Sequence, residues 1–259
     1  MNQHEEFRAD RVKRVKDLQS DKDMNTASLS WTTESVRHQY VYNFEWLGRP
    51  IIQYPQDMVA MQELIWNLKP DVVVETGIAH GGSLVLSASI LAMLDYEDAL
   101  RDGTLLDPRK PKRHVVGVDI DIRAHNRTAI EAHPMSTRIN MIQGSSVDPD
   151  TVARVKQQVG NARTVLVALD SNHTHEHVLS ELEAYGPLVT PGSYCVVFDT
   201  FVENLPVGIF PDRPWAVGNS PLSAVREYLV THKEFEVDED ISAKLQITAA
   251  PGGFLKRKG

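Results

Sequence analysis

Short apolar runs alternate along the chain with segments whose apolar residues recur at helical spacing. The runs 72–77, 114–121, 139–144, 165–170 and 192–199 predict five buried β-strands. The segments 57–68, 83–94 and 127–133 predict helices, and further helices follow the third and fourth strands. Because strands that alternate with helices pair in parallel, we expect an α/β fold with helices on both faces of the sheet. The continuously apolar strands indicate that both faces are buried.

The two ends of the chain depart from this pattern. Residues 1–48 are polar, weakly patterned and free of glycine before Gly48, which predicts a helical N-terminal extension that acts as a lid or an oligomer contact. We expect residues 49–259 to form the main domain, with a charged loop at 95–113. Near the C-terminus, a Pro/Gly-rich loop (205–221) precedes a helix (222–232) and strand-like pieces at 235–237 and 244–248.

The composition of the 259 residues, with 42% apolar and 24% charged side chains, is typical of a globular protein. The net charge of −8 gives no indication of a nucleic-acid or membrane surface. Arg8 to Lys16 lack the apolar core of a signal peptide, and no run approaches the ~18 apolar residues of a membrane span. The lone Cys195 excludes an intramolecular disulfide and is expected to be a buried, inert thiol. We therefore expect a cytoplasmic protein.

The segment from Val72 to Ser83 predicts a ligand site. A β-strand runs into an acid and three glycines, and a helix follows, which is the arrangement found where ligands bind at the carboxyl edge of a parallel sheet. Glycines let a ligand approach the backbone, and the helix N-terminus offers free N–H groups. The Gly-x-Gly-x-x-Gly fingerprint of a dinucleotide site is missing, because Gly81 follows Gly77 only after a step of four positions. Glu75 argues against a bare pyrophosphate, so we expect a nucleoside-type cofactor.

Polar residues end each predicted strand at what should be one edge of the sheet. They are Glu75, Asp119 with Asp121, Ser145 with Ser146, Asp170 and Asp199. An acid after the second strand is suited to accept hydrogen bonds from ribose hydroxyls. Any single acid of this set serves equally well as a cap for the following helix. The convergence of five such positions favours a ligand site.

This ordered set resembles the class I S-adenosylmethionine-dependent methyltransferases, and among them the cephalosporin hydroxylase/rhamnosyl O-methyltransferase family. The first motif of the class is similar to Glu75-x-Gly77-x-Ala79-x-x-Gly82-Ser83. The likeness spans about 44–256 and includes Trp46-Leu47-Gly48-x-Pro50, the run 69–77, Asp170 and the closing Pro251-Gly252-Gly253-Phe254-Leu255. The resemblance implies a Rossmann-like, mostly parallel seven-stranded sheet and S-adenosylmethionine as the methyl donor.

The resemblance also implies roles for individual residues in binding the cofactor. Gly77 and Ala79 would approach its methionine part, with Glu75 and Ser83 beside it. Asp119 would hold the ribose, and Ser145 or Ser146 would border the adenine. Asp170 would also border the cofactor. An acid at Glu75 suits the positively charged end of S-adenosylmethionine, which is the chemistry that the turn itself indicates.

The segment Asp170 to His177 holds histidines at positions 173, 175 and 177. His173 follows Asp170 by three residues, and an imidazole that titrates near neutrality suits the deprotonation of an acceptor hydroxyl. Related sugar O-methyltransferases show the same Asp-x-x-His arrangement, which implies that His173 is the base and Asp170 a Mg²⁺ ligand. A histidine-rich tract can also bind a transition metal. We expect His175 and His177 instead to be solvated residues at the start of a helix.

Asp170 and Asp199 lie at adjacent strand ends, where two carboxylates suit a hard divalent cation such as Mg²⁺. The chain departs here from its relatives, which carry a second oxygen ligand where this chain has Phe198. Thr200, Glu203 or water would then complete the set.

These observations predict a Mg²⁺-assisted O-methyltransferase that acts on a hydroxyl of a natural product or its deoxysugar. We expect a small-molecule acceptor, no nucleic-acid or membrane partner, and a homo-oligomer as in relatives. Trp215 and Phe210 would form an apolar acceptor wall, although a tryptophan in such a loop is as often part of the core. Two alternatives remain open. The chain would be a cofactor-binding protein that supports a hydroxylation partner, or a non-catalytic binding subunit.

Overall fold

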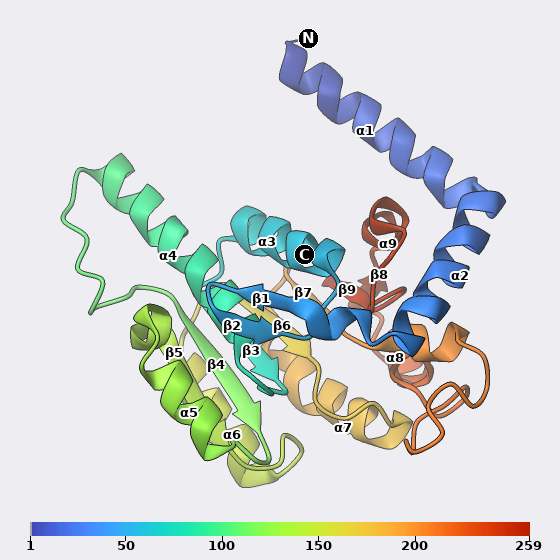
Figure 1. Cartoon of the computed structure of the whole chain (residues 1–259). Helices are drawn as coiled ribbons and strands as arrows, with labels where there is room; N and C mark the ends of the chain where they lie inside the picture. The colour runs from blue at the N-terminus through green and yellow to red at the C-terminus, as the bar shows by residue number, and fades with distance from the viewer. Residues whose placement is uncertain (1) are drawn as a thin grey trace.

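The computed structural model describes residues 2–259 and contains a seven-stranded sheet between two layers of helices (Figure 1). The strand order is β5-β4-β3-β6-β7-β9-β8, and the ladders from β5 to β7 are parallel, whereas β9 is antiparallel to both of its neighbours. The strands are β3 (Val72–Thr76), β4 (His114–Asp119), β5 (Ile139–Gln143), β6 (Val165–Leu169), β7 (Tyr194–Val197), β8 (Phe235–Val237) and β9 (Phe254–Arg257). The predicted fold class is confirmed.

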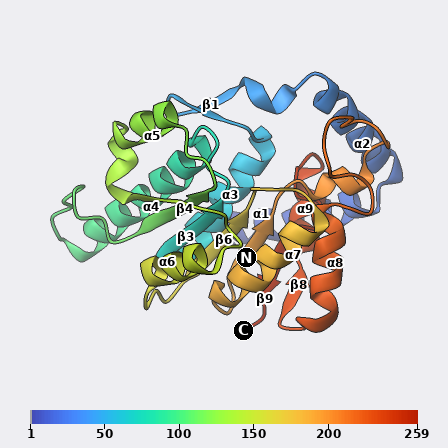
Figure 2. The ribbon, with the colours of Figure 1, turned by 90° about the horizontal axis from the view of Figure 1, so that it is seen from below.

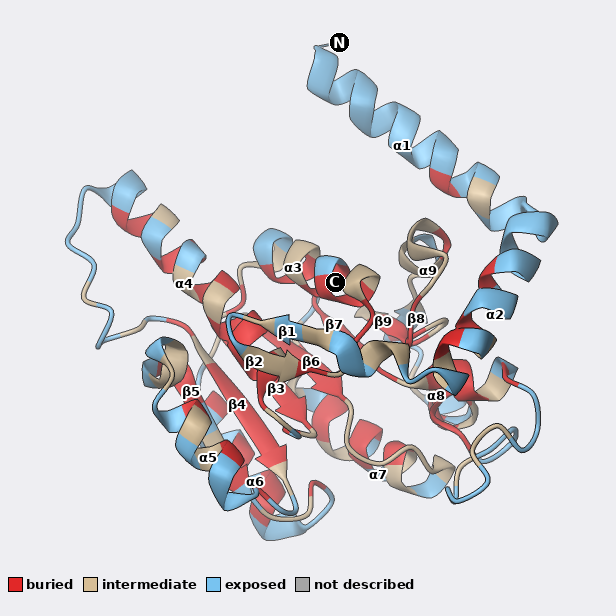
Figure 3. Ribbon diagram, viewed as in Figure 1, coloured by how far each residue is buried: buried red, intermediate tan, exposed pale blue. Residues whose placement is uncertain are grey.

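Alternate residues of the strands pack against opposite helix layers. One face, with Val73 and Leu166, packs against α3 (Pro55–Leu68), α4 (Gly82–Asp102), α5 (Ala124–Glu131) and α9 (Glu239–Leu245). The other face, with Val74 and Val167, packs against α6 (Pro149–Val159), α7 (His175–Tyr185) and α8 (Pro221–Thr231). The view in Figure 2 shows these layers from below, and Figure 3 shows the buried strands between them. The strands are continuously apolar because helices cover both faces of the sheet, as the sequence predicts.

The N-terminal region is helical, as predicted, and continues into a small hairpin. It contains α1 (Gln3–Ser20), α2 (Lys22–Arg37), β1 (Phe44–Trp46) and β2 (Arg49–Ile51). The helix α1 projects away from the body and is almost wholly exposed (Figure 3). The Ser28 hydroxyl donates to Oε1 of Gln246, at 3.1 Å, and so ties α2 to the end of α9. The boundary predicted at residue 48 falls in the turn of the β1–β2 hairpin.

Two local predictions differ from the structure. The predicted loop 95–113 begins later, because α4 continues to Asp102. Its acids are drawn inward, since buried Asp95 forms ion pairs with Arg113 at 2.6 Å and Arg138 at 2.9 Å. The charged residues of the segment 95–113 therefore do not all belong to a loop, since some of them form a buried ion-pair network at the end of α4.

The strand predicted at 244–248 is wrong. The segment Glu239–Leu245 forms α9, with acids in its first turn where they stabilise the free N–H groups. Ile241 and Leu245, one helical turn apart, pack against the core. The last strand is β9, which is inserted between β7 and β8.

Cys195 is buried in β7, as predicted, and burial raises the pKa of its thiol. Within residues 2–259, no helix combines the length and the apolar character needed to cross a membrane.

Candidate active site

A cavity of about 770 Å³ opens at the carboxyl ends of β3, β6 and β7. Three groups of residues line it: the glycine loop 77–83, the strand-end residues Asp170, His173 and Asp199, and a set from the N-terminal region and the loop 209–215. The cavity therefore lies at the edge of the sheet at which the sequence predicts a ligand site.

The glycine loop is packed tightly against the next strand end. Gly77 has φ +88°, and a Cβ at this position would lie 2.0 Å from the carbonyl oxygen of Asp170. Ala79 has φ +45°, a left-handed conformation that its Cβ disfavours. The first-turn N–H groups of α4 receive no side-chain cap. The loop therefore brings bare backbone to the cavity wall, as the sequence predicted.

Glu75 lies behind this loop and does not line the cavity. Its carboxylate is buried and accepts a hydrogen bond from the Ser83 hydroxyl. Burial raises the pKa of Glu75 to about 7, and the Ser83 hydrogen bond opposes this rise. Ser83 itself lines the cavity, so it connects Glu75 to the site.

Asp119 supports the glycine loop from the neighbouring strand. Its Oδ2 accepts hydrogen bonds from the backbone N–H groups of Ile78, at 2.8 Å, and Ala79, at 3.2 Å. Its Oδ1 accepts from the N–H of Asp121, at 3.0 Å. The capping alternative considered for these acids therefore applies to Asp119, although it caps the loop after β3 instead of a helix of its own. Binding of a ribose by this carboxylate stays a prediction.

The serines predicted beside the adenine do not line the cavity in this structure. Ser146 is buried, and its Oγ lies 3.0 Å from Nε2 of His177. His175 is also held, with Nδ1 2.8 Å from the Ser223 hydroxyl. The expectation that His175 and His177 are simply solvated is wrong, because their side chains are only 28% and 23% exposed. Both histidines serve to fix the start of α7.

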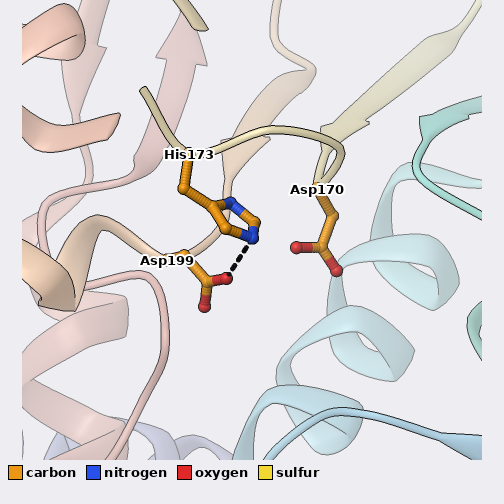
Figure 4. A group of neighbouring side chains, drawn as sticks. All are labelled: Asp170, His173 and Asp199. Carbon is orange, nitrogen blue, oxygen red and sulfur yellow. Dashed lines mark ion pairs between the residues drawn. The ribbon is translucent and has the colours of Figure 1, made fainter. Parts of the chain in front are cut away.

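Asp170, His173 and Asp199 form one cluster (Figure 4). Nε2 of His173 lies 2.9 Å from Oδ2 of Asp199, and one potential ligand atom from each of the three residues lies within 4.8 Å of the others. Asp199 has φ +54°, so the end of β7 bends through a left-handed residue to present its carboxylate. The structure thus brings together the residues predicted as the base and the metal ligands.

The electrostatics of the cluster reflect burial and like charges. Burial, followed by the nearby carboxylates of Asp199 and Glu75, raises the pKa of Asp170 well above its usual range. Burial lowers the pKa of His173, but the charge and hydrogen bond of Asp199 outweigh it and leave the pKa raised. Two carboxylates this close favour a cation between them, whether a proton or a metal ion.

The substitute ligands considered for this cluster point elsewhere. Thr200 is buried and donates to the carbonyl of Pro251, at 2.9 Å. Glu203 accepts hydrogen bonds from the N–H of Gly218, at 2.9 Å, and from the Ser220 hydroxyl, and so anchors the base of the loop 205–219. Neither side chain is free to join Asp170 and Asp199. Among residues 2–259, His173 is the side chain that is grouped with Asp170 and Asp199 as a potential third ligand.

The wall opposite the glycine loop is mixed aromatic and polar. The Trp215 ring packs edge-to-face against His173, with centroids 4.7 Å apart, and the Arg213 guanidinium lies 5.1 Å from the Trp215 centroid. Phe210 also lines the cavity, as predicted. The loop 205–219 lies beside α2 in both ribbon views (Figures 1 and 2).

The sequence predicted a lid or an oligomer contact in the N-terminal region, but it did not indicate which residues of α2 line the cavity. Ser35, Val36 and Arg37 line it from the last turn of this helix. The Ser35 hydroxyl lies 2.7 Å from the hydroxyl of buried Tyr54, whose pKa burial raises to about 12. No motif connects these positions, because the contact depends on how the N-terminal helix folds back over the sheet.

Comparison with known proteins identifies the family. The family described as rhamnosyl O-methyltransferase/CmcI matches residues 38–258. The chain belongs to this family. A rhamnosyl O-methyltransferase of Mycobacterium tuberculosis is 29% identical over 205 residues, which cover 78% of this chain and 73% of that protein. The rhamnosyl O-methyltransferase of Mycobacterium leprae is 28% identical over 242 residues, covering 87% and 92% of the two chains.

Among solved structures, an apo structure of CmcI has the same fold. Its TM-score is 0.53 at 17% sequence identity, over 84% of this chain and 77% of that chain. The family predicted from the motifs is therefore confirmed. The family match begins at residue 38, just after α2. The cavity-lining residues Ser35, Val36 and Arg37 of this protein therefore lie outside the matched region.

Proposed function

We propose that this protein is an S-adenosylmethionine-dependent O-methyltransferase that methylates a hydroxyl of a small-molecule acceptor with the help of a divalent cation. One observation carries the proposal. The Asp170–His173–Asp199 cluster and the glycine loop line the same cavity of a chain in the rhamnosyl O-methyltransferase/CmcI family.

The cofactor site fits the residues present. Gly77 and Ala79 present backbone without bulk, and the uncapped N-terminus of α4 offers N–H groups to the methionine carboxylate. Ser83 lies beside this position, and the carboxylate of Glu75, buried behind the loop and bonded to Ser83, would supply negative charge near the positively charged end of the cofactor. When bound, S-adenosylmethionine supplies a methyl group on a sulfonium, the electrophile for an in-line displacement. Asp119 would hold the ribose with the lone pairs that its backbone contacts leave free.

The two carboxylates of the cluster fit a divalent metal ion. Asp170 and Asp199 would hold a divalent cation, which supplies a Lewis acid that binds the acceptor oxygen and lowers the pKa of its hydroxyl. Burial and the neighbouring carboxylates raise the pKa of Asp170, and a cation held between Asp170 and Asp199 would oppose that rise. Phe198 is buried and contributes no ligand atom.

His173 accepts the proton of the acceptor hydroxyl in this proposal. Asp199 holds the imidazole through Nε2 and stabilises the imidazolium that forms. Trp215 restricts the ring from another side. The remaining work of the protein is to align the hydroxyl with the methyl group and to exclude water.

His173 could instead serve as a third metal ligand, because its Nε2 belongs to the same cluster. His173→Ala separates the two roles. If His173 is the base, the variant loses turnover, and its Mn²⁺ affinity in a calorimetric titration falls by at most about 100-fold, because His173 then contacts the ligand Asp199 only as an outer partner. A loss of Mn²⁺ affinity of more than about 100-fold would show that the imidazole is itself a ligand.

The acceptor is proposed to be a sugar hydroxyl, following the rhamnosyl acceptors in the names of the relatives. The aromatic wall of Phe210 and Trp215 suits the apolar face of a sugar ring or of its aglycone. We further propose that the N-terminal region acts as a lid on the acceptor side, because Val36 and Arg37 line the cavity. A homo-oligomer stays a prediction.

The direct test incubates the purified protein with S-adenosylmethionine, Mg²⁺ and small rhamnosides. A product heavier by one methylene supports methylation, whereas a gain of one oxygen with a partner present supports the hydroxylation alternative. Calorimetric binding of S-adenosylhomocysteine without turnover on any acceptor would favour a non-catalytic subunit.

A further inference from the structure

The β1–β2 hairpin packs directly on the glycine loop. A Cβ on Gly82 would lie 2.3 Å from the carbonyl oxygen of Pro50, so no side chain fits between the two segments. From β2, the Arg49 guanidinium donates to the carbonyl oxygen of His80 through both Nε, at 3.0 Å, and Nη2. A segment from the N-terminal region thus reaches the centre of the cofactor loop.

Asn126 of α5 supports the same loop from the other side. It is 4% exposed, and its Nδ2 donates to the carbonyl oxygen of Ala79 at 2.9 Å. Its Oδ1 accepts a hydrogen bond from Nη2 of Arg49, at 3.2 Å. One planar guanidinium and one amide therefore bind two consecutive loop carbonyls and each other, a geometry that the fork of arginine allows and a lysine ammonium does not.

The contacts of Arg49 and Asn126 fix the direction in which the backbone carbonyls of Ala79 and His80 point. Asp119 accepts the N–H groups of Ile78 and Ala79, and Asn126 and Arg49 occupy the carbonyls of Ala79 and His80. They also hold Ala79 in its left-handed conformation, which its Cβ disfavours. With the carbonyls turned to these two side chains, the loop presents the N–H end of α4 to the cavity. An anionic group of a ligand would meet backbone donors at this end of the helix.

We propose that Arg49 and Asn126 are positioning residues that hold the glycine loop in its cofactor-binding conformation before the cofactor arrives. This inference rests on the proposed function, since it assigns the loop to S-adenosylmethionine. Neither residue needs to touch the cofactor, because both act through the backbone of Ala79 and His80. A preorganised loop binds more tightly, because less conformational freedom is lost on binding.

The test measures S-adenosylhomocysteine binding by calorimetry. Asn126→Ala and Arg49→Met should each weaken binding about tenfold, which corresponds to about 1.4 kcal/mol. Asn126→Asp separates the two contacts, since its carboxylate keeps the Arg49 hydrogen bond but repels the Ala79 carbonyl, and should weaken binding at least as much. Asn140→Ala and Arg163→Met, which change exposed residues far from the loop, serve as matched controls.

A double-mutant cycle distinguishes positioning from general damage. Glycine tolerates φ +45°, so Asn126→Ala should cost less affinity in the Ala79→Gly background than in the wild type. Equal losses in both backgrounds, or wild-type affinity in all the variants at 49 and 126, would overturn the inference. A wild-type protein that does not bind S-adenosylhomocysteine would instead overturn the proposed function.

Discussion

Nε2 of His173 lies 2.9 Å from Oδ2 of Asp199, in an ion pair that joins the loop after β6 to the end of β7 (Figure 4). Its strength depends on burial, because neither side chain is widely exposed and water screens the pair only weakly. Asp199 thereby connects two functions that the sequence assigned separately, the orientation of a base and the binding of a metal ion.

The pH dependence of kcat/KM should report this pair. A base must be neutral, and Asp199 raises the pKa of His173, so we expect activity to rise with pH through a midpoint above the usual range of histidine. Asp199→Asn removes the charge and the hydrogen bond through which Asp199 raises this pKa, and it leaves the lowering effects of burial and of Arg213 against the raising effect of Glu181. Its remaining activity should therefore rise at a lower pH than that of the wild type. An unchanged midpoint would mean that His173 is not the group that titrates.

Chelation should test the metal. We expect EDTA to abolish methyl transfer and added Mg²⁺ to restore it, because the hydroxyl pKa would otherwise stay too high for His173. Asp170→Asn should lower Mn²⁺ affinity by more than tenfold, because it removes a proposed ligand carboxylate. The fold should be retained, since burial already disfavours the ionised form of Asp170. Full activity in EDTA would remove Asp170 and Asp199 from the proposed metal site.

A pair of glycines separates steric from conformational effects. Gly77→Ala would place a Cβ 2.0 Å from the Asp170 carbonyl at φ +88°, whereas Gly192→Ala has the similar φ of +82° with no atom within 4 Å. We expect Gly192→Ala to reduce the free energy of unfolding by about 1 kcal/mol, the cost of strain alone. Gly77→Ala should cost about 3 kcal/mol or more and abolish S-adenosylhomocysteine binding. Urea unfolding and calorimetry measure both quantities, and equal costs would contradict the packing described for Gly77.

The stability of the protein should fall as the pH rises from about 4 to about 7. Burial raises the pKa of Asp57 from 3.8 to about 7, against hydrogen bonds from the Ala249 N–H and the Thr248 hydroxyl. The unfolded chain then ionises first, so the folded state loses stability across this window and none above it. The loss from Asp57 amounts to about 4 kcal/mol.

Asp57→Asn should reduce this slope in urea unfolding measured at pH 4, 5.5 and 7. Glu75 and Asp170, whose pKa values are raised in the same direction, would maintain part of it. At pH 4 the variant should be about 1 kcal/mol less stable than the wild type, because the amide nitrogen that replaces one carboxyl oxygen cannot accept a hydrogen bond from the Thr248 hydroxyl or the Ala249 N–H. A slope that is identical in the variant would show that Asp57 is ionised in the folded state.

The local pattern of the sequence determined the sheet, its two buried faces and the edge at which the site lies. A short, continuously apolar run such as 165–169 predicts a strand that is buried on both faces of a sheet. The carboxyl ends of parallel strands meet at one edge of the sheet, independently of the conformation of the loops. For the same reason Asp170 and Asp199 could be placed together before their contacts were known. Gly77 was predicted from the strand–turn–helix pattern, and the structure adds that a Cβ at this position would lie 2.0 Å from the carbonyl oxygen of Asp170.

The tertiary structure alone decided which way each polar side chain turns. Asp119 faces the glycine loop, Ser146 faces His177, and Glu203 anchors a loop instead of a metal. Arg49 and Asn126 meet at the cofactor loop although 77 positions separate them in the sequence. Periodicity and strand ends are properties of neighbouring residues, and they fix the elements. Hydrogen-bond partners across distant segments depend instead on how those elements pack, a property that no local pattern records.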